Sequence, residues 1–373
     1  MRDAALTMRC VQETASSFSE YESVLKAYSS WVLNVQSETD PNGIDVRTEP
    51  KFELPNGEPF AGGWCRPQND GPGLRATSLM MFANTLIDQN DSTFVSENLW
   101  TGDGSKNGGA IKYDLDYVVG NYQSSTCDLW EEYTADDLFW NRITMKKAMI
   151  LGADFATKMG DTDAAASYTA TAQAIDSTLY DTHWTGSAVI EHTGRTYDGA
   201  VIVGFNVGFD PSDNLFAPSS FEVASTVKEY NAMFCDEYAI NTQDSGDNVP
   251  GVLYGRYQND NYAGGNPWVL TTAALGNLLY RGGNYVKKHG LPSSDALETW
   301  SDVFGVDSSE ITADTFVTAG DAVLNRLKFH IGDTFHLDEQ IDRNTGVQMS
   351  AEDLTWSYAE VLNAMSSRDK FFA

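Results

Sequence analysis

The chain has 373 residues, of which 53 are acidic and 24 are basic, and its formal net charge at pH 7 is −29. This excess of negative charge repels phosphate backbones and anionic lipid headgroups, so nucleic-acid and membrane partners are not expected. Charged residues make up only 21% of the chain and aromatic residues 12%, which excludes an acidic disordered chain. A neutral substrate is left, and many aromatic rings suit a sugar, whose C–H faces stack on them.

Apolar residues recur at helical spacing along most of the chain. In the segment 18–35 they lie three and four residues apart, as Tyr21 and Leu25 illustrate, which predicts one apolar face of a helix. The same spacing predicts further helices, in chain order, over 3–13, 73–88, 92–99, 110–122, 135–158, 163–181, 219–240, 267–284, 294–303, 311–330 and 351–366. Alternation typical of strands occurs only at 187–191 and 200–206.

Long loops rich in Gly, Pro and Asn separate these helices. They lie at 40–73, 101–109, 241–266 and 331–350. Loops of this length are unusual in a compact domain and mark functional candidates. Roughly a dozen helices in pairs predict one all-α domain over residues 1–373. An α/α toroid whose loops form the mouth of a site is favoured, and a helical solenoid is the alternative.

The cysteines predict no metal site, and neither a metal nor a cofactor is expected. None of the four stands in a CxxC pair, and the five histidines lack the spacing of zinc ligands. If the four are oxidised, three pairings are open. The cysteines are Cys10, Cys65, Cys127 and Cys235.

Two acidic segments stand out as carriers of chemistry. The first is DLWEE, which runs from Asp128 to Glu132, and the second is Asp338-Glu339-Gln340. Taken alone, the first is typical of an acidic helix start, which the helix dipole favours. The second, taken alone, is typical of a solvated loop.

Other segments make the pattern specific. These are residues 61–77 (AGGWCRPQNDGPGLRAT), 254–268 (YGRYQNDNYAGGNPW) and 354–359 (LTWSYA). Together with the two acidic segments, and in this order, they closely resemble the glucoamylases, glycoside hydrolase family 15. The resemblance implies an (α/α)6 barrel and exo-acting hydrolysis of terminal α-1,4-linked glucose, with slower action on α-1,6 links. The reaction inverts the anomeric centre and releases β-D-glucose from starch, glycogen or maltodextrins.

The resemblance also implies the catalytic residues. Glu131 would be the general acid, because desolvation beside Trp64 and Trp130 favours its protonated form. Glu339 would be the base that activates water, and inversion then requires the two carboxyl groups to lie about 6.5–9.5 Å apart. Asp128, three residues before Glu131, would share its face on a helical turn and is a secondary catalytic candidate.

Substrate contacts follow in the same way. Arg2 and Asp3 resemble the pair that grips the non-reducing glucose, which would make the enzyme exo-acting. Further sugar contacts are expected, and tryptophans are expected to cover the cleft. The residues expected in these roles are Trp64, Leu129, Trp130, Glu132, Arg256 and Trp356.

Three neighbours of these motifs stay open. Arg66 and Gln68 are equally consistent with shaping their loop and with a functional contact. Asp70, before Gly71-Pro72, is interpreted as a turn or capping residue.

The first residues indicate a chain that begins inside the family's usual sequence. Arg2 to Thr7 resembles a segment that is normally internal, so the barrel is expected to lack its first helix, and the natural protein is expected to be secreted or vacuolar. We also expect a monomer without a starch-binding domain. The alternatives are a glucodextranase or trehalase relative, a non-catalytic carbohydrate-binding module, or a truncated pseudo-enzyme.

Overall fold

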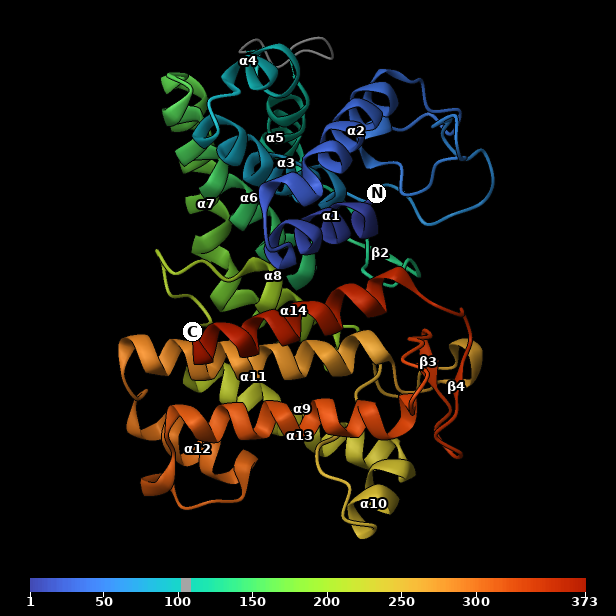
Figure 1. Ribbon diagram of the computed structural model, residues 1–373, viewed down its shortest axis with the longest axis vertical. Coiled ribbons are helices and arrows are strands. Elements are labelled where there is room, and N and C mark those ends of the chain that lie inside the picture. The colour runs from blue at the N-terminus through green and yellow to red at the C-terminus, as the bar shows by residue number, and fades with distance from the viewer. Residues whose placement is uncertain (102–108) are drawn as a thin grey trace. The chain divides into compact units, whose positions relative to one another are not determined.

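The computed structural model describes residues 1–101 and 109–373, and the chain divides into two compact units, Met1–Leu179 and Tyr180–Ala373 (Figure 1). Helices supply nearly all the regular structure of both. Within the described residues the sheets are two antiparallel pairs of two-residue strands, β1–β2 and β3–β4. The prediction of an all-α chain is therefore confirmed. Most of the predicted loop 101–109 lies outside the described residues.

The first unit is built from the helices that its periodicity predicts, together with a strand pair, β1–β2, that it does not predict. Its elements are α1 (Arg2–Thr14), α2 (Phe18–Ser37), the 3₁₀ turn η1 (Val46–Thr48), α3 (Asp70–Asp88), α4 (Ser92–Phe94), the π-helical turn η2 (Val95–Leu99), α5 (Ala110–Asn121), β1 (Thr126–Cys127), β2 (Thr134–Ala135), α6 (Phe139–Lys158) and α7 (Thr162–His183), which runs into the start of the second unit.

Helix α3 forms the centre of the first unit because it packs against α1, α5 and α6 at once. Apolar residues on several sides of it are therefore buried, among them Leu79 and Phe82. Leu115 of α5 and Met149 of α6 join them in one hydrophobic cluster. Close packing of this kind fixes the N-terminal ends of α1 and α3, which carry residues of the candidate site.

The second unit continues the pattern of paired helices. Its elements are α8 (Ala200–Gly208), α9 (Phe221–Glu237), α10 (Ala239–Gly246), η3 (Tyr262–Gly264), α11 (Val269–His289), α12 (Ser294–Phe304), η4 (Ser308–Glu310), α13 (Ala313–Ile331), β3 (Gln340–Ile341), β4 (Gln348–Met349) and α14 (Thr355–Phe372).

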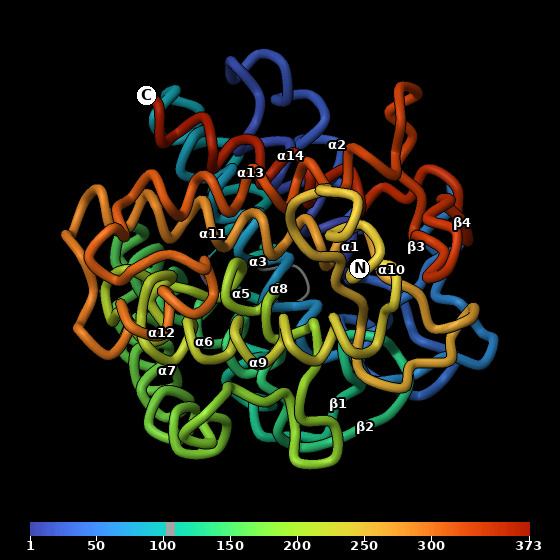
Figure 2. The backbone as a smooth tube through the Cα atoms, turned by 90° about the horizontal axis from the view of Figure 1, so that it is seen from below, coloured from blue at the N-terminus to red at the C-terminus, as the bar shows by residue number. Residues whose placement is uncertain are grey.

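Helix α11 has the corresponding role in the second unit. It packs against α8, α13 and α14, and the last two lie beside it in Figure 1. Gly283 permits the close approach of α13, because a Cβ there would lie 2.9 Å from the Ala313 carbonyl oxygen. Helix α12 packs against α9, as the backbone trace in Figure 2 lets the reader follow. No helix of the described part is both long and apolar enough to span a bilayer.

Two predictions of local structure were wrong. The alternating segment 200–206 is helix α8, and every residue of that helix is buried. A helix buried on all sides is apolar all round, so its sequence cannot be told from a buried strand by periodicity. The segment 187–191 forms only an isolated bridge, Trp184 to Val189. Helix α10 was also missed, since it lies where a helix end and a loop were expected.

A buried ion pair between α3 and α5 gives a test of the packing in the first unit. Arg75 and Asp114 are 0% exposed, and the guanidinium donates from Nε and Nη2 to the two carboxylate oxygens at 2.6 and 2.5 Å. Asp114→Ala should lower the free energy of unfolding by about 3–5 kcal/mol, because it leaves a buried charge without its partner. Urea denaturation measures the change.

The control for this test is Glu13→Ala, which breaks the more exposed Arg9–Glu13 pair of α1. It should cost less than about 1 kcal/mol. Equal destabilisation by the two substitutions would contradict the argument from burial.

Candidate active site

The DLWEE segment lies in the loop between β1 and β2, where a tight turn presents Glu131. The amide of Glu131 donates to the carbonyl of Asp128 at 3.2 Å, which closes the turn. The Asp128 carboxylate is buried and accepts from the amides of Glu132 at 2.7 Å and Tyr133 at 3.2 Å. The predicted helical turn was therefore wrong. Asp128 holds the turn through backbone hydrogen bonds, and its catalytic role remains a prediction.

The turn gives Glu131 an unusual backbone conformation. Its φ is 65°, in the left-handed region that residues other than glycine rarely occupy. Such a conformation persists only when its surroundings restrain it, and it is concentrated at functional sites.

Two side chains from the loop before α3 hold the Glu131 carboxylate. Trp64 Nε1 donates to Oε2 at 2.7 Å, and Gln68 Nε2 donates to Oε1 at 2.7 Å. Arg2 Nη1 lies 3.8 Å from Oε1. The side chain of Glu131 is 31% exposed, so one side of a firmly held carboxyl group remains open to a ligand.

Arg2 is buried at the N-terminal end of α1 and is itself held from two directions. Its Nε donates to Asp70 Oδ2 at 2.5 Å, and its Nη1 donates to the carbonyl of Leu129 at 2.9 Å. Burial alone lowers the pKa of Arg2, but the charge and the hydrogen bond of Asp70 outweigh it and raise that pKa. Its Nη2 is buried and has no hydrogen-bond partner in the described residues, so it can donate to a ligand.

The structure gives Gln68, which the sequence left open, and Asp70, which was interpreted as a turn or capping residue, contacts with groups of the site. Asp70 is the first residue of α3. Its carboxylate is fully buried, and besides the hydrogen bond from Arg2 it accepts one from Trp140 Nε1 at 2.7 Å. Arg66 shapes the loop: its Nε donates to Glu49 Oε2 at 2.5 Å, and its Nη1 donates to the Gly62 carbonyl at 2.9 Å. The sequence signal for Asp70 was its position directly before Gly71-Pro72, in the same motif segment as Trp64.

A cavity of about 480 Å³ lies directly over these groups. Lys51 Nζ stands 4.3 Å from the centre of the Trp64 ring, which is 42% exposed. The lining combines charged groups with aromatic rings, and this combination suits a sugar ring. The lining residues are Met1, Arg2, Asp3, Ala4, Trp31, Pro50, Lys51, Phe52, Leu54, Trp64, Gln68 and Glu131.

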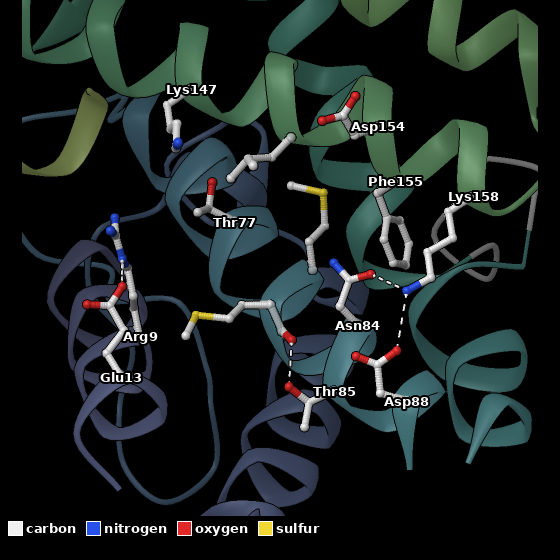
Figure 3. Close-up of a pocket in the computed structure, with 13 residues that line it drawn as sticks. Arg9, Glu13, Thr77, Asn84, Thr85, Asp88, Lys147, Asp154, Phe155 and Lys158 are labelled. Atoms are coloured by element: carbon white, nitrogen blue, oxygen red, sulfur yellow. Dashed lines mark hydrogen bonds and ion pairs between the residues drawn. The ribbon is translucent and has the colours of Figure 1, made fainter. Parts of the chain in front are cut away.

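A larger cavity of about 570 Å³ in the same unit contains none of the predicted site residues. It lies among α1, α3 and α6 (Figure 3). Arg9 Nε donates to Glu13 at 2.7 Å, and Lys158 Nζ donates to Asn84 at 2.8 Å and lies 3.9 Å from Asp88 Oδ1. The predicted site residues Arg2, Asp3, Trp64 and Glu131 line the smaller cavity instead.

A disulfide joins Cys65, beside Trp64, to Cys127, at the start of the Glu131 turn. It settles the open pairing, and Cys10 and Cys235 remain thiols. In the described part of the chain, Cys65, Cys127 and Asp128 form the one cluster with metal-ligand geometry, but the disulfide removes both thiolates. Closing a loop of 62 residues stabilises the fold by about 4 kcal/mol in the chain-entropy model.

Glu339, the predicted base, lies directly before β3 in the second unit. Its side chain is 8% exposed, and Oε2 accepts from Ser350 Oγ at 2.5 Å and from Gln340 Nε2 at 3.0 Å. Its amide donates to the Ala351 carbonyl at 2.9 Å. Oε1 has no hydrogen bond within the described ranges, which leaves one oxygen able to accept from water.

Arg256 is organised around the loop that precedes α11. It donates from Nε and Nη2 to both oxygens of Asp260, at 2.8 and 2.6 Å. Its guanidinium lies 4.8 Å from the Tyr262 ring centre and 5.5 Å from that of Trp268. Burial, followed by the charge of Glu339, raises the pKa of Tyr262. The amide of Val269, next to Trp268, donates to the carbonyl of Glu339 at 3.2 Å, so Arg256 and Glu339 lie in one region of the second unit.

The remaining predicted contacts differ in exposure. Trp130 is buried, and Leu129 contributes its carbonyl to Arg2. Glu132 is exposed. Trp356 is buried in α14, where its Nε1 donates to Glu360 at 3.2 Å.

Comparison with known proteins identifies the family of the chain. The family model described as glycosyl hydrolases family 15 matches residues 1–366. The glucoamylase of Blastobotrys adeninivorans is 33% identical, over 99% of this chain and 64% of its own length, and glucoamylase 1 of Rhizopus oryzae is 31% identical, over 97% and 63%. The chain thus spans about two thirds of the length of these relatives.

Solved structures of glucoamylases also match the chain. The family 15 glucoamylase of Hypocrea jecorina matches with a TM-score of 0.87 at 28% identity, over 99% of this chain and 64% of its own. The glucoamylase of Saccharomycopsis fibuligera matches with a TM-score of 0.79 at 26% identity, over 100% and 86%.

These matches show a fold of the (α/α)6 barrel class. More narrowly, the chain belongs to glycosyl hydrolases family 15. The resemblance drawn from its motifs is confirmed.

The loop around Glu339 contains an exposed pair that should respond to pH. His336 Nδ1 lies 2.8 Å from Asp353 Oδ1. The hydrogen bond and charge of Asp353 raise the pKa of His336 above 6.5, so this stabilisation is complete below about pH 6.5 and is lost as the pH rises through the raised pKa. Hydrogen bonds from Tyr358 and then His336 lower the pKa of Asp353, so its contribution is lost only in stronger acid.

His336→Gln should therefore speed amide exchange in residues 336–354 at about pH 5, relative to the parent protein. The difference should be smaller at about pH 8, because the stabilisation by charged His336 is lost as the pH rises through its raised pKa. Hydrogen exchange read by mass spectrometry, corrected for the intrinsic rate, measures it. An equal difference at both pH values would contradict the assignment.

Proposed function

We propose that this protein is a glucoamylase, an exo-acting, inverting glycosidase that releases β-D-glucose from the non-reducing ends of α-1,4-linked glucans. Starch, glycogen and maltodextrins are the proposed substrates, with slower action on α-1,6 links. Membership of the family and the names of its relatives support this proposal. The observation that carries it is the Glu131 carboxyl group, held by Trp64 and Gln68 beside buried Arg2 in one cavity.

Glu131 would protonate the leaving glycosidic oxygen. A protonated carboxyl group keeps one acceptor oxygen while its O–H becomes a donor. Gln68 or Trp64 can therefore retain one oxygen of Glu131 while the other gives its proton to the substrate. Because the turn fixes the backbone, the carboxyl group needs little reorganisation when the bond breaks.

Glu339 would take a proton from the water that attacks the anomeric carbon. The hydrogen bonds from Ser350 and Gln340 go to Oε2, so Oε1 would accept from this water. Attack on the face opposite the leaving group inverts the anomeric centre and gives β-glucose. The separation of about 6.5–9.5 Å between the two carboxyl groups stays a prediction.

Arg2 and Asp3 would bind the terminal glucose. The buried Nη2 of Arg2 lacks a partner in the described residues, and a sugar hydroxyl would accept from it. Asp3 lines the same cavity and would accept from a neighbouring hydroxyl. Binding a chain end in this way supports release of one glucose at a time.

We also propose that residues 1–373 form one catalytic domain, since the family model spans both compact units. A secreted or vacuolar location is proposed on the Cys65–Cys127 disulfide, because disulfides persist in oxidising compartments.

Replacing either catalytic carboxylate tests the mechanism. Glu131→Gln and Glu339→Gln should each lower glucose release from maltoheptaose by about 10²- to 10⁴-fold, because each removes a proton-transfer group. Glucose oxidase assays measure the rate, and proton NMR of the first product identifies the anomer.

The matched controls are two exposed acids close to these residues, Asp136→Asn and Glu352→Gln, which should keep the parent rate. Full activity in both catalytic variants would remove the mechanism. An inactive parent protein that still binds maltoheptaose would indicate a carbohydrate-binding module instead.

Arg2→Lys tests the recognition of the terminal glucose. Lysine cannot donate to Asp70, Leu129 and a sugar hydroxyl in the same planar arrangement. A hydrogen bond from a charged donor contributes about 1.5–3 kcal/mol, so kcat/KM should fall by about 10- to 100-fold. Arg9→Lys, about two helical turns further along α1, is the control, and an unchanged kcat/KM for Arg2→Lys would oppose the assignment.

A further inference from the structure

We propose that the Cys65–Cys127 disulfide is a positioning device for Glu131, which keeps its two side-chain donors in place during catalysis. This inference rests on the proposed function. It concerns two residues that neither the family motifs nor the predicted chemistry assigned to the reaction.

The Cys65–Cys127 disulfide joins the loop that carries Trp64 and Gln68 to the segment that carries Glu131. On one side, Trp64 directly precedes Cys65 and Gln68 follows it by three residues. On the other side, Glu131 follows Cys127 by four residues. The two bridged Cα atoms are 5.8 Å apart, and next to them the amide of Cys127 donates to the carbonyl of Pro67 at 2.8 Å.

The hydrogen bond from Trp64 to Glu131 is open to competition from water, because Trp64 is 42% exposed and Glu131 is 31% exposed. Gln68 is buried, but its hydrogen bond also joins two segments that are far apart in the chain. A hydrogen bond to a charged group contributes about a factor of 10 to 100 to its own equilibrium. A covalent link between the two segments keeps each donor near the carboxylate at high effective concentration.

The backbone of Glu131 adds a second reason. Its positive φ requires restraint from the surroundings. Asp128 restrains the turn from inside through the amides of Glu132 and Tyr133. The disulfide restrains the strand that enters the turn, at Cys127, which is 0% exposed.

The bridge should affect turnover more than binding. Arg2 is anchored by Asp70, which is at the start of α3, and Asp3 lies on α1. The Asp70 anchor and the position of Asp3 on α1 do not depend on the bridge, and only the contact of Arg2 with the Leu129 carbonyl lies in the bridged turn. Loss of the disulfide should therefore lower kcat while KM changes little.

The test compares the parent protein with the double variant Cys65→Ala, Cys127→Ala. We expect kcat for maltoheptaose to fall about tenfold and KM to stay within about twofold. Amide exchange in residues 128–135 should become faster, which is a readout that does not need activity. Cys235→Ser, an exposed thiol on α9, is the control and should leave kcat, KM and exchange unchanged.

A double-mutant cycle separates positioning from general stabilisation. Gln68→Ala removes one donor to Glu131. If the bridge acts by delivering that donor, Gln68→Ala should lower kcat less in the disulfide-free protein than in the parent. Additive effects on kcat would overturn the inference and leave a structural role only.

The remaining outcomes are also decisive. A folded double variant with parent kcat and parent exchange overturns the inference while the proposed function stands. A parent protein that releases no glucose refutes the proposed function, and the exchange readout then still judges the positioning.

If the double variant fails to fold, the parent is reduced in place with a phosphine. Phosphorus gives up two electrons to the S–S bond, and water supplies the phosphine oxide oxygen and the two thiol protons. Thiols are counted by mass after alkylation. Fully reduced protein with unchanged kcat overturns the inference, and a tenfold loss supports it.

Discussion

The buried guanidinium of Arg2 is the interaction on which the candidate site of the first unit depends. It binds Asp70 at the start of α3 and the Leu129 carbonyl in the Glu131 turn. One side chain at the start of α1 thus fixes two other segments. A buried charge is costly unless it is paired and hydrogen-bonded, and Asp70 and Leu129 supply that compensation. Arg2 Nη2 has no hydrogen-bond partner in the described part of the chain. One donor of this buried charge is therefore left for a ligand in the cavity that Arg2 lines.

In the second unit the side-chain amide of Asn266 joins separate segments, as the guanidinium of Arg2 does in the first. Asn266 donates from Nδ2 to the Gln340 side chain at 2.9 Å, and its Oδ1 accepts from the amide of Arg343 at 3.1 Å. The residue before it must be glycine, because a Cβ on Gly265 would lie 1.8 Å from the Asp260 carbonyl oxygen. This loop therefore ties the Arg256–Asp260 pair to the strand that follows Glu339.

The strong negative charge of the chain is compatible with this chemistry because the substrate proposed is neutral. Several acids are buried and paired with arginines, among them Asp70, Asp114 and Asp260. Their charges are compensated locally, so they add little to self-repulsion. The remaining acids lie mostly at the surface, where water screens them.

The sequence by itself determined the helices, the family and the two catalytic candidates. Helical periodicity and motif spacing are local properties, so a single chain displays them. It could not determine that Asp70 binds Arg2, that Gln68 holds Glu131, or that Cys65 pairs with Cys127. Each of these contacts joins residues more than sixty positions apart, and no spacing rule links them. Local pattern also failed at α8, where complete burial erased the periodicity. Only tertiary packing decided these features, because it brings distant segments together and sets which polar groups must find partners.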